Sequence, residues 1–173
     1  YNLDRINGGN FLFELKRYNP QPQYDAAIEL LRSQLLTQPR TTDGGFWHKK
    51  IYPSQMWLDG LYMAEPFYAR YAIEQQQMEL FDDIAHQFII VDKHTKKENG
   101  LNYHGWDESK EQAWANKESG CSNMCWGRAE GWYFMAIVDV LEYMPTNHPQ
   151  KSILLDILQR VGRHLIETRS RLE

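Results

Sequence analysis

Apolar residues recur at helical spacing along most of the chain. In segment 24–35 they lie three or four positions apart, and the segment is bounded by Pro22 and Pro39, which predicts an amphipathic helix. The same spacing recurs in segments 134–144 and 154–165 and predicts two further helices. Most of the chain therefore favours helix over strand.

Three more segments, 4–17, 55–75 and 79–94, are also predicted to be helical. We expect the second of these helices to be broken or restarted at Pro66, because proline lacks the amide hydrogen that the helix ladder needs. The best candidate for β-structure is a short hairpin over residues 98–106, which contain an Asn-Gly turn signal.

The pattern as a whole predicts an all-α fold, built from antiparallel helix pairs joined by loops, with at most a short β-hairpin. At 173 residues, the chain is long enough for one domain with a sizeable core. Nothing in the sequence suggests a second domain, so we expect a single domain over residues 1–173.

Two of the predicted helices begin with a similar tetrapeptide. Residues 59–62 and 130–133 both read acid, Gly, large apolar residue, Tyr, as stacked helical-hairpin repeats do. We expect this echo to bring the two helix starts to one rim, where their dipoles and side chains face a common cleft.

Charge and composition exclude several kinds of partner. The net charge is -4 with a pI near 5.9, and the basic residues are scattered, so we expect no nucleic-acid partner and no anionic membrane surface. The apolar runs are too short to span a bilayer. Six Trp and ten Tyr offer stacking faces for a ring-shaped ligand, although aromatic residues more often form the core.

The cysteines and the N-terminus add two expectations. Cys121 and Cys125 have no His or Cys partner at zinc-site spacing, so we expect free thiols and no bound metal. The first residues show no basic region followed by an apolar one. We therefore expect a cytoplasmic protein, with the periplasm as the open alternative.

Asp59 is the first candidate for chemistry. Residues 56–58 and 61–63 around it are apolar or aromatic, and no basic residue lies within eight positions on either side. A carboxyl group that loses water when such a segment packs has a raised pKa and can act as a proton donor near neutral pH. The alternative is that Asp59 caps a helix or bonds a backbone amide, as an Asp before Gly often does.

Asp4 is the candidate for a second carboxylate. It stands near the start with Asn7, and the neighbouring Arg5 should favour its ionised form if their side chains approach. One protonated and one charged acid is the arrangement used for acid-base chemistry on sugars. The sequence alone does not bring Asp4 to Asp59.

Trp126, Arg128 and Trp132 form a possible grip for a sugar acid. Two indoles bracket one guanidinium in the segment WGRAEGWY. Arginine can bind a carboxylate through its two-pronged fork, while an indole covers the apolar face of a sugar. The alternative is a structural cation-π pair with a buried Trp.

Two histidines and a reserve acid lie in predicted loops. His104 and Asp107 belong to YHGWDES, and His48 follows a Gly pair in GGFWHKK. Loops on helical scaffolds commonly carry function, and His104 could donate a hydrogen bond to a sugar hydroxyl, although a loop His is often only solvated. We expect Asp107 to be exposed, or structural within its turn, and hold it as the reserve catalytic acid.

Taken together, these motifs resemble those of the bacterial unsaturated rhamnogalacturonyl hydrolases. The segments NLDRIN, GGFWHKKIYPSQMWLDGLYM, YHGWDESK and WGRAEGWYFMAIVDVLEYMP follow the same order as in that family. The resemblance implies helical hairpins forming the middle part of an (α/α)6 toroid. It also implies hydration of the C4=C5 double bond in the unsaturated galacturonyl residue that ends a pectin fragment, which releases the remaining saccharide.

The resemblance also suggests roles for particular residues. Asp59 in MWLDG would be the general acid and base, and Asp4 in NLDRIN the assisting carboxylate. The other matched residues would bind substrate: two histidines would line the cleft, and two tryptophans with one arginine would hold the unsaturated uronate. These are His48, His104, Trp126, Arg128 and Trp132. Asp107 gains no support, and neither a cofactor nor a metal is implied.

The chain departs from the family in two respects. Family members are about twice as long, so we expect an incomplete toroid that leaves apolar helix faces unpaired. This implies a truncated chain, an incompletely recorded one, or an assembly such as a homo-oligomer that covers the open faces. Ala129 and Glu130 replace a small or apolar pair, which would put a charge close to Arg128. The alternatives for function are an unsaturated glucuronyl hydrolase acting on glycosaminoglycan fragments, a non-catalytic carbohydrate-binding helical protein, and a helical-repeat interaction scaffold.

Overall fold

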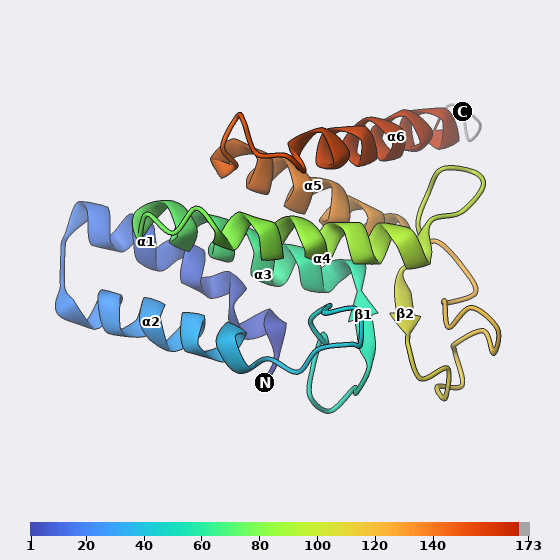
Figure 1. Cartoon of the computed structure of the whole chain (residues 1–173), viewed down its shortest axis with the longest axis horizontal. Helices are drawn as coiled ribbons and strands as arrows, with labels where there is room; N and C mark the ends of the chain where they lie inside the picture. Colours follow the sequence, from blue (N-terminus) through green and yellow to red (C-terminus); the bar gives the residue numbers. More distant parts are fainter. Residues whose placement is uncertain (170–173) are drawn as a thin grey trace.

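In the computed structural model, which describes residues 1–169, consecutive helices pack in pairs (Figure 1). Two 3-10 turns, Leu3–Arg5 and Asn7–Gly9, precede the first helix. The helices are α1 (Asn10–Tyr18), α2 (Pro22–Thr37), α3 (Leu58–Glu74), α4 (Leu80–Thr95), α5 (Gly127–Tyr143) and α6 (Lys151–Arg169). Helix α1 packs on α2, α3 on α4 and α5 on α6, so the predicted helical hairpins are confirmed.

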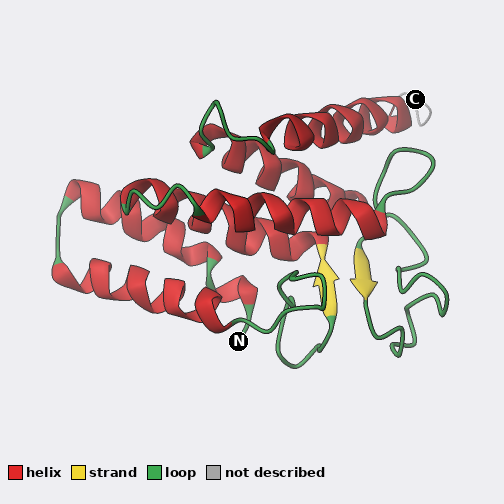
Figure 2. Ribbon diagram, viewed as in Figure 1, coloured by secondary structure: helices red, strands yellow, loops and turns green. Residues whose placement is uncertain are grey.

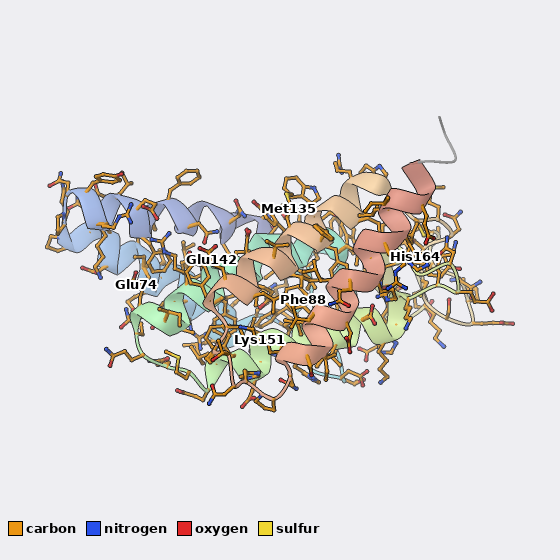
Figure 3. All side chains as sticks on the ribbon, turned by 90° about the horizontal axis from the view of Figure 1, so that it is seen from above. Glu74, Phe88, Met135, Glu142, Lys151 and His164 are labelled. Atoms are coloured by element: carbon orange, nitrogen blue, oxygen red, sulfur yellow. The ribbon has the colours of Figure 1, made fainter. Side chains whose placement is uncertain are left out.

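Helix α3 is the centre of the fold. Residues on every side of it are buried, among them Leu58, Ala64 and Phe67, each 0% exposed. Its most extensive packing is against α5, and the view from above shows α5 and α6 lying across the α3 and α4 pair (Figure 3). The starts of α3 and α5 meet, since Asp59 and Arg128 line one pocket, but Glu130 of the echoed tetrapeptide is buried and does not line it.

Pro66 does not break α3, contrary to the prediction. The helix runs through it because the backbone group that a proline leaves unpaired finds another partner. A proline at position 66 cannot donate to the carbonyl of Tyr62, four residues earlier. That carbonyl instead accepts a hydrogen bond from the side-chain amide of Asn7 at 3.2 Å. Asn7 thus supports the helix that carries Asp59.

A two-stranded sheet stands where the sequence predicted a helix start and a local hairpin. Strand β1 (Gln55–Trp57) pairs antiparallel with β2 (Gly105–Asp107), so the helix predicted from residue 55 begins only at Leu58. The Asn-Gly turn does form: Gly100 has φ +80°, and one bridge between Lys96 and Asn102 closes it. The strand beyond that turn, however, pairs with β1 rather than folding back on its neighbour.

The long loops and the small sheet gather at one end of the helical layers (Figure 2). Because β1 leads directly into α3, the sheet fixes the first turn of α3 beside the loops that follow β2. Among residues 1–169, no helix combines the length and the apolar character that crossing a bilayer requires.

Candidate active site

Asp59 lies in the first turn of α3, one residue after the helix begins. It is half-buried. The helix N-cap is Trp57, which makes no side-chain capping bond, so Asp59 is not the capping residue that its position before Gly allowed.

Asp59 lines a pocket of about 350 Å³ at the end of the small sheet. Four residues proposed from the sequence line this pocket: Asp59, His104, Trp126 and Arg128. Sequence reasoning missed the other lining residues, which come from the end of β1, the start of β2 and the loop after β2. These are Trp57, Gly105 and Trp114.

The pKa of the Asp59 carboxyl is raised above its usual value of 3.8, chiefly because burial removes water from the charged form. A backbone hydrogen bond at Asp59 itself and the positive charges of Arg128 and His104 oppose this shift, while the negative charge of Asp4 adds to it. Desolvation outweighs the opposing charges, so the pocket holds a carboxylic acid that keeps its proton to higher pH than a free Asp.

The Arg128 guanidinium lies over the Trp126 ring, 3.7 Å from its centroid. Trp126 is 43% exposed, so this cation-π pair stands on the pocket wall and not around a buried indole. Within the described part of the chain, no carboxylate forms a salt bridge with Arg128. Its charge is therefore available to an anionic ligand in the pocket.

His104 is held by the loop that precedes α5. Its Nδ1 lies 3.1 Å from the carbonyl oxygen of Met124, and its ring meets Trp126 edge to face with centroids 6.0 Å apart. Because a carbonyl oxygen only accepts, Nδ1 donates this hydrogen bond, and Nε2 is the second polar atom of the ring. His104 thus contributes a polar side chain to the pocket that Asp59 lines.

Asp4 and His48 do not line the pocket. The imidazole of His48 is 2% exposed and is stacked behind Trp57 with ring centroids 4.8 Å apart. Its Nε2 lies 3.1 Å from one Asp4 oxygen, and Lys49 Nζ lies 2.5 Å from the other. Asp4 therefore pairs with Lys49 and His48, and no ion pair with the expected partner Arg5 is formed in the described residues.

His48 is a neutral second layer of the site. Burial lowers its pKa to about 4, even though Asp4 favours its charged form. It packs tightly against the start of α3, where a Cβ on Gly60 would come within 2.6 Å of His48 Nδ1. The Asp-Gly pair at this helix start therefore serves packing: the glycine lets His48 approach and support Trp57.

Trp132 also stands outside the pocket. It lies one helical turn beyond Arg128 on α5 and packs against Tyr62 of α3, with ring centroids 4.7 Å apart. It joins the two helices that carry Asp59 and Arg128. Of the two indoles predicted from WGRAEGWY, Trp126 lines the pocket and Trp132 does not; the other pocket indoles are those of Trp57 and Trp114.

Glu130 points away from Arg128, contrary to expectation. It is 1% exposed and accepts a hydrogen bond from the backbone amide of Asn102. The charges that act on it are those of Arg160 and Asp92. The residue therefore belongs to a buried polar cluster with Asn102 and, within the described residues, forms no ion pair with Arg128.

Replacing Glu130 by Gln is expected to flatten the dependence of stability on pH. Burial raises the pKa of Glu130 from 4.5 to about 7, so between these values the folded state holds a proton that the unfolded state has lost. The free energy of unfolding is therefore not reduced by Glu130 below about pH 4.5. It falls by about 3 kcal/mol as the pH rises from about 4.5 to about 7.

The Glu130→Gln variant keeps an acceptor for the Asn102 amide and carries no charge to bury. Urea unfolding should show it more stable than wild type above about pH 7 and similar to it near pH 4.5. An equal difference between the two proteins at both pH values would show that Glu130 does not titrate in this range.

Asp107, the reserve acid, is buried and structural. It is 0% exposed. Its Oδ1 accepts hydrogen bonds from the amide and hydroxyl of Ser109 at 3.0 and 2.6 Å, and its Oδ2 accepts one from the amide of Gln112 at 3.0 Å. Of the two expectations for Asp107, exposure is wrong and the structural role within its turn is confirmed, because these donors make Asp107 the anchor of the loop after β2.

Neither cysteine forms a disulfide. Cys121 is buried, and its thiol donates a hydrogen bond to the carbonyl oxygen of His94, while Cys125 is half-buried. Burial raises the pKa of both thiols, so neither is an activated nucleophile.

Comparison with known proteins identifies the class. The model of Glycosyl Hydrolase Family 88 matches residues 1–171. The solved structure of a glycoside hydrolase from family 105 of C. acetobutylicum ATCC 824 superposes with a TM-score of 0.94 at 46% identity, over 96% of this chain and 47% of that one. The fold is thus that of the glycoside hydrolases, and the predicted toroid-type hairpins are confirmed.

More particularly, the chain belongs to glycosyl hydrolase family 88. It is 28% identical over 163 residues to the unsaturated rhamnogalacturonyl hydrolase YesR of Bacillus subtilis (strain 168), covering 86% of this chain and 44% of that protein. It is 42% identical over 83 residues to Protein Atu3128 of Agrobacterium fabrum, covering 48% of this chain and 36% of that protein. The chain therefore spans less than half the length of these relatives.

Proposed function

We propose that the protein is an unsaturated rhamnogalacturonyl hydrolase, which hydrates the C4=C5 double bond of the unsaturated galacturonyl residue at the non-reducing end of its substrate. The observation that carries the proposal is a pocket lined by the sheltered acid Asp59 and by Arg128, which forms no salt bridge within residues 1–169, together with indole side chains. An acid that keeps its proton and a cation that binds a carboxylate are the two groups this reaction needs.

The reaction begins with proton transfer. The protonated carboxyl of Asp59 gives its proton to C4 of the vinyl ether, and the electron pair of the double bond forms the new C–H bond, which leaves positive charge shared by C5 and the ring oxygen. The Asp59 carboxylate then takes a proton from a water molecule, whose oxygen bonds to C5. The resulting hemiketal opens at its ring oxygen, and the hemiacetal left at C1 releases the remaining saccharide.

The other pocket residues bind and orient the sugar. Arg128 would pair with the carboxylate attached to C5. The Trp126 ring lies beneath the guanidinium of Arg128 and holds this guanidinium in position. His104 offers a polar atom beside Asp59. Asp4, held by His48 and Lys49, assists at longer range: its negative charge raises the pKa of Asp59 and so favours the acid form.

The choice of a galacturonyl substrate is supported by the relative YesR, whose name states that activity. It can be tested directly by incubating the protein with an unsaturated galacturonyl-rhamnose disaccharide and, separately, with an unsaturated glucuronyl-hexosamine disaccharide. Loss of the ultraviolet absorbance of the conjugated double bond should be faster with the first. Faster loss with the second would favour the glucuronyl hydrolase, and binding without loss of either would favour a carbohydrate-binding protein.

A further inference from the structure

Asn7 joins the segment that carries Asp4 to the helix that carries Asp59. Its side-chain amide donates a hydrogen bond to the backbone carbonyl of Tyr62 at 3.2 Å. Pro66 inside α3 leaves that carbonyl without its usual helical donor, so the donor comes from outside the helix. Tyr62 lies only three residues after Asp59. The bond is therefore made within one helical turn of the proposed acid.

The backbone between Asp4 and Asn7 is a stiff connection. It forms two consecutive 3-10 turns. The amide of Ile6 donates to the carbonyl of Leu3 at 2.9 Å, and the amide of Gly9 donates to the carbonyl of Ile6 at 2.8 Å. Residues three apart in such turns lie on the same side of the backbone, and Asp4 and Asn7 are three apart. A displacement of Asn7 from α3 would therefore carry Asp4 with it.

The same segment packs against α3 on either side of Asn7. A Cβ on Gly9 would come within 2.6 Å of the Phe67 ring, and a Cβ on Gly60 would come within 3.3 Å of Leu3. These apolar contacts hold the segment close to the helix, but they have no preferred direction. The hydrogen bond from Asn7 is directional, so it fixes the position of the segment along the helix.

The position of Asp4 affects the chemistry because its negative charge raises the pKa of Asp59. Burial raises this pKa further, while the positive charges of Arg128 and His104 lower it. Arg128 belongs to α5, and His104 stands directly before β2. Of the three charged side chains that act on Asp59, only Asp4 therefore lies on the segment that Asn7 attaches to α3.

We propose that Asn7 is a positioning residue, which fixes the carboxylate of Asp4 relative to the carboxyl of Asp59 through the carbonyl that Pro66 leaves without a helical donor. The inference rests on the proposed function, in which Asp59 is the acid and Asp4 assists it. Pro66 provides the free acceptor, and Asn7 provides the donor from the neighbouring segment.

Asn7→Ala tests the proposal through the titration of Asp59. Without the bond Asp4 can move away, so Asp59 should titrate at lower pH than in the wild type, as measured by carbon-13 NMR. With substrate, kcat/KM should fall about tenfold, and its high-pH limb should move to lower pH together with the titration. Asn10→Ala is the matched control. Its amide bonds the Asn7 carbonyl at 3.1 Å within the segment itself, so the wild-type titration and rate should be kept.

Pro66→Ala separates positioning from helix stability. Alanine at position 66 supplies the missing backbone amide, and the Tyr62 carbonyl can accept this bond together with that of Asn7. Asn7→Ala should therefore lower the urea midpoint of unfolding less in the Pro66→Ala protein than in the wild type. The shift in the titration of Asp59 should be equal in both backgrounds. The double variant also provides the measurement if Asn7→Ala alone does not fold.

Three outcomes would overturn the proposal. Asn7→Ala could leave the titration of Asp59 unchanged, Pro66→Ala could restore the wild-type titration in the Asn7→Ala protein, or Asn10→Ala could shift the titration equally. The NMR measurement needs no substrate. A shifted titration in a protein that does not remove the double bond would therefore reject the proposed hydrolysis and retain the positioning role of Asn7.

Discussion

Replacing Asp59 by Asn should lower kcat for loss of the substrate double bond by about 10³-fold, because the amide can neither donate the proton to C4 nor accept one from water. The change is nearly isosteric in a half-buried position, so the fold and the binding of the saccharide should be preserved. The initial rate of loss of the ultraviolet absorbance of the double bond gives kcat, and calorimetry gives the affinity for the saccharide.

A matched control is Asp156→Asn, which makes the same change on an exposed part of α6 and should keep the wild-type rate. If Asp59→Asn retains more than about a tenth of the wild-type kcat, the proton comes from another group. If it loses affinity and rate together with its folded structure, the variant reports on stability alone.

Replacing Arg128 by Ala should have the second largest effect, a rise in KM of about 10- to 100-fold, because hydrogen bonds to a charged group contribute about 1.5–3 kcal/mol. Arg128 also lowers the pKa of Asp59. Its removal should therefore raise that pKa further, and the high-pH limb of kcat/KM, where Asp59 loses its proton, should move to higher pH.

Arg128→Lys separates these two effects. Lysine keeps the positive charge near Asp59 and loses the two-pronged fork, so the high-pH limb should stay close to that of the wild type while KM still rises. A KM unchanged in both variants would show that Arg128 does not bind the uronate. A limb that moves to lower pH in the alanine variant would contradict its electrostatic role.

The helices could be predicted from the sequence because their apolar spacing and bounding prolines are local signals. The interruption predicted at Pro66 was wrong because the side chain that completes the helix, Asn7, lies far away in sequence. The strands failed for the same reason: residues 55–57 look helical by themselves, and only pairing with residues 105–107 makes them a strand.

The candidate site shows a similar division. Local polarity singled out Asp59, yet Glu65 in the same segment is more deeply buried, at 0% exposed, and burial raises its pKa well above 4.5. Glu65 lines none of the described cavities. An apolar local sequence therefore predicts a buried carboxyl with a raised pKa. Which of these carboxyls lines a pocket depends on how α3, α5 and the loop after β2 pack together.

Trp57 and Trp114 were missed because nothing in their immediate sequence distinguishes a pocket indole from a core indole. A signal was present in Trp114, which stands in a polar loop that also carries Asn116 and Ser119, where an aromatic residue has little core to join. His48 illustrates the reverse: its motif suggested a cleft residue, and the glycine at position 60 lets it pack into the layer behind Trp57 instead.

The most direct test of the account is a carbon-13 NMR titration of the aspartate carboxyl groups, in which the resonance absent from the Asp59→Asn protein identifies Asp59. This carboxyl should titrate clearly above 3.8, the usual pKa of an aspartate, and kcat/KM should fall over the same pH range. A carboxyl of Asp59 that titrates at or below 3.8 would contradict the proposed function, because such a group would have no proton to give near neutral pH.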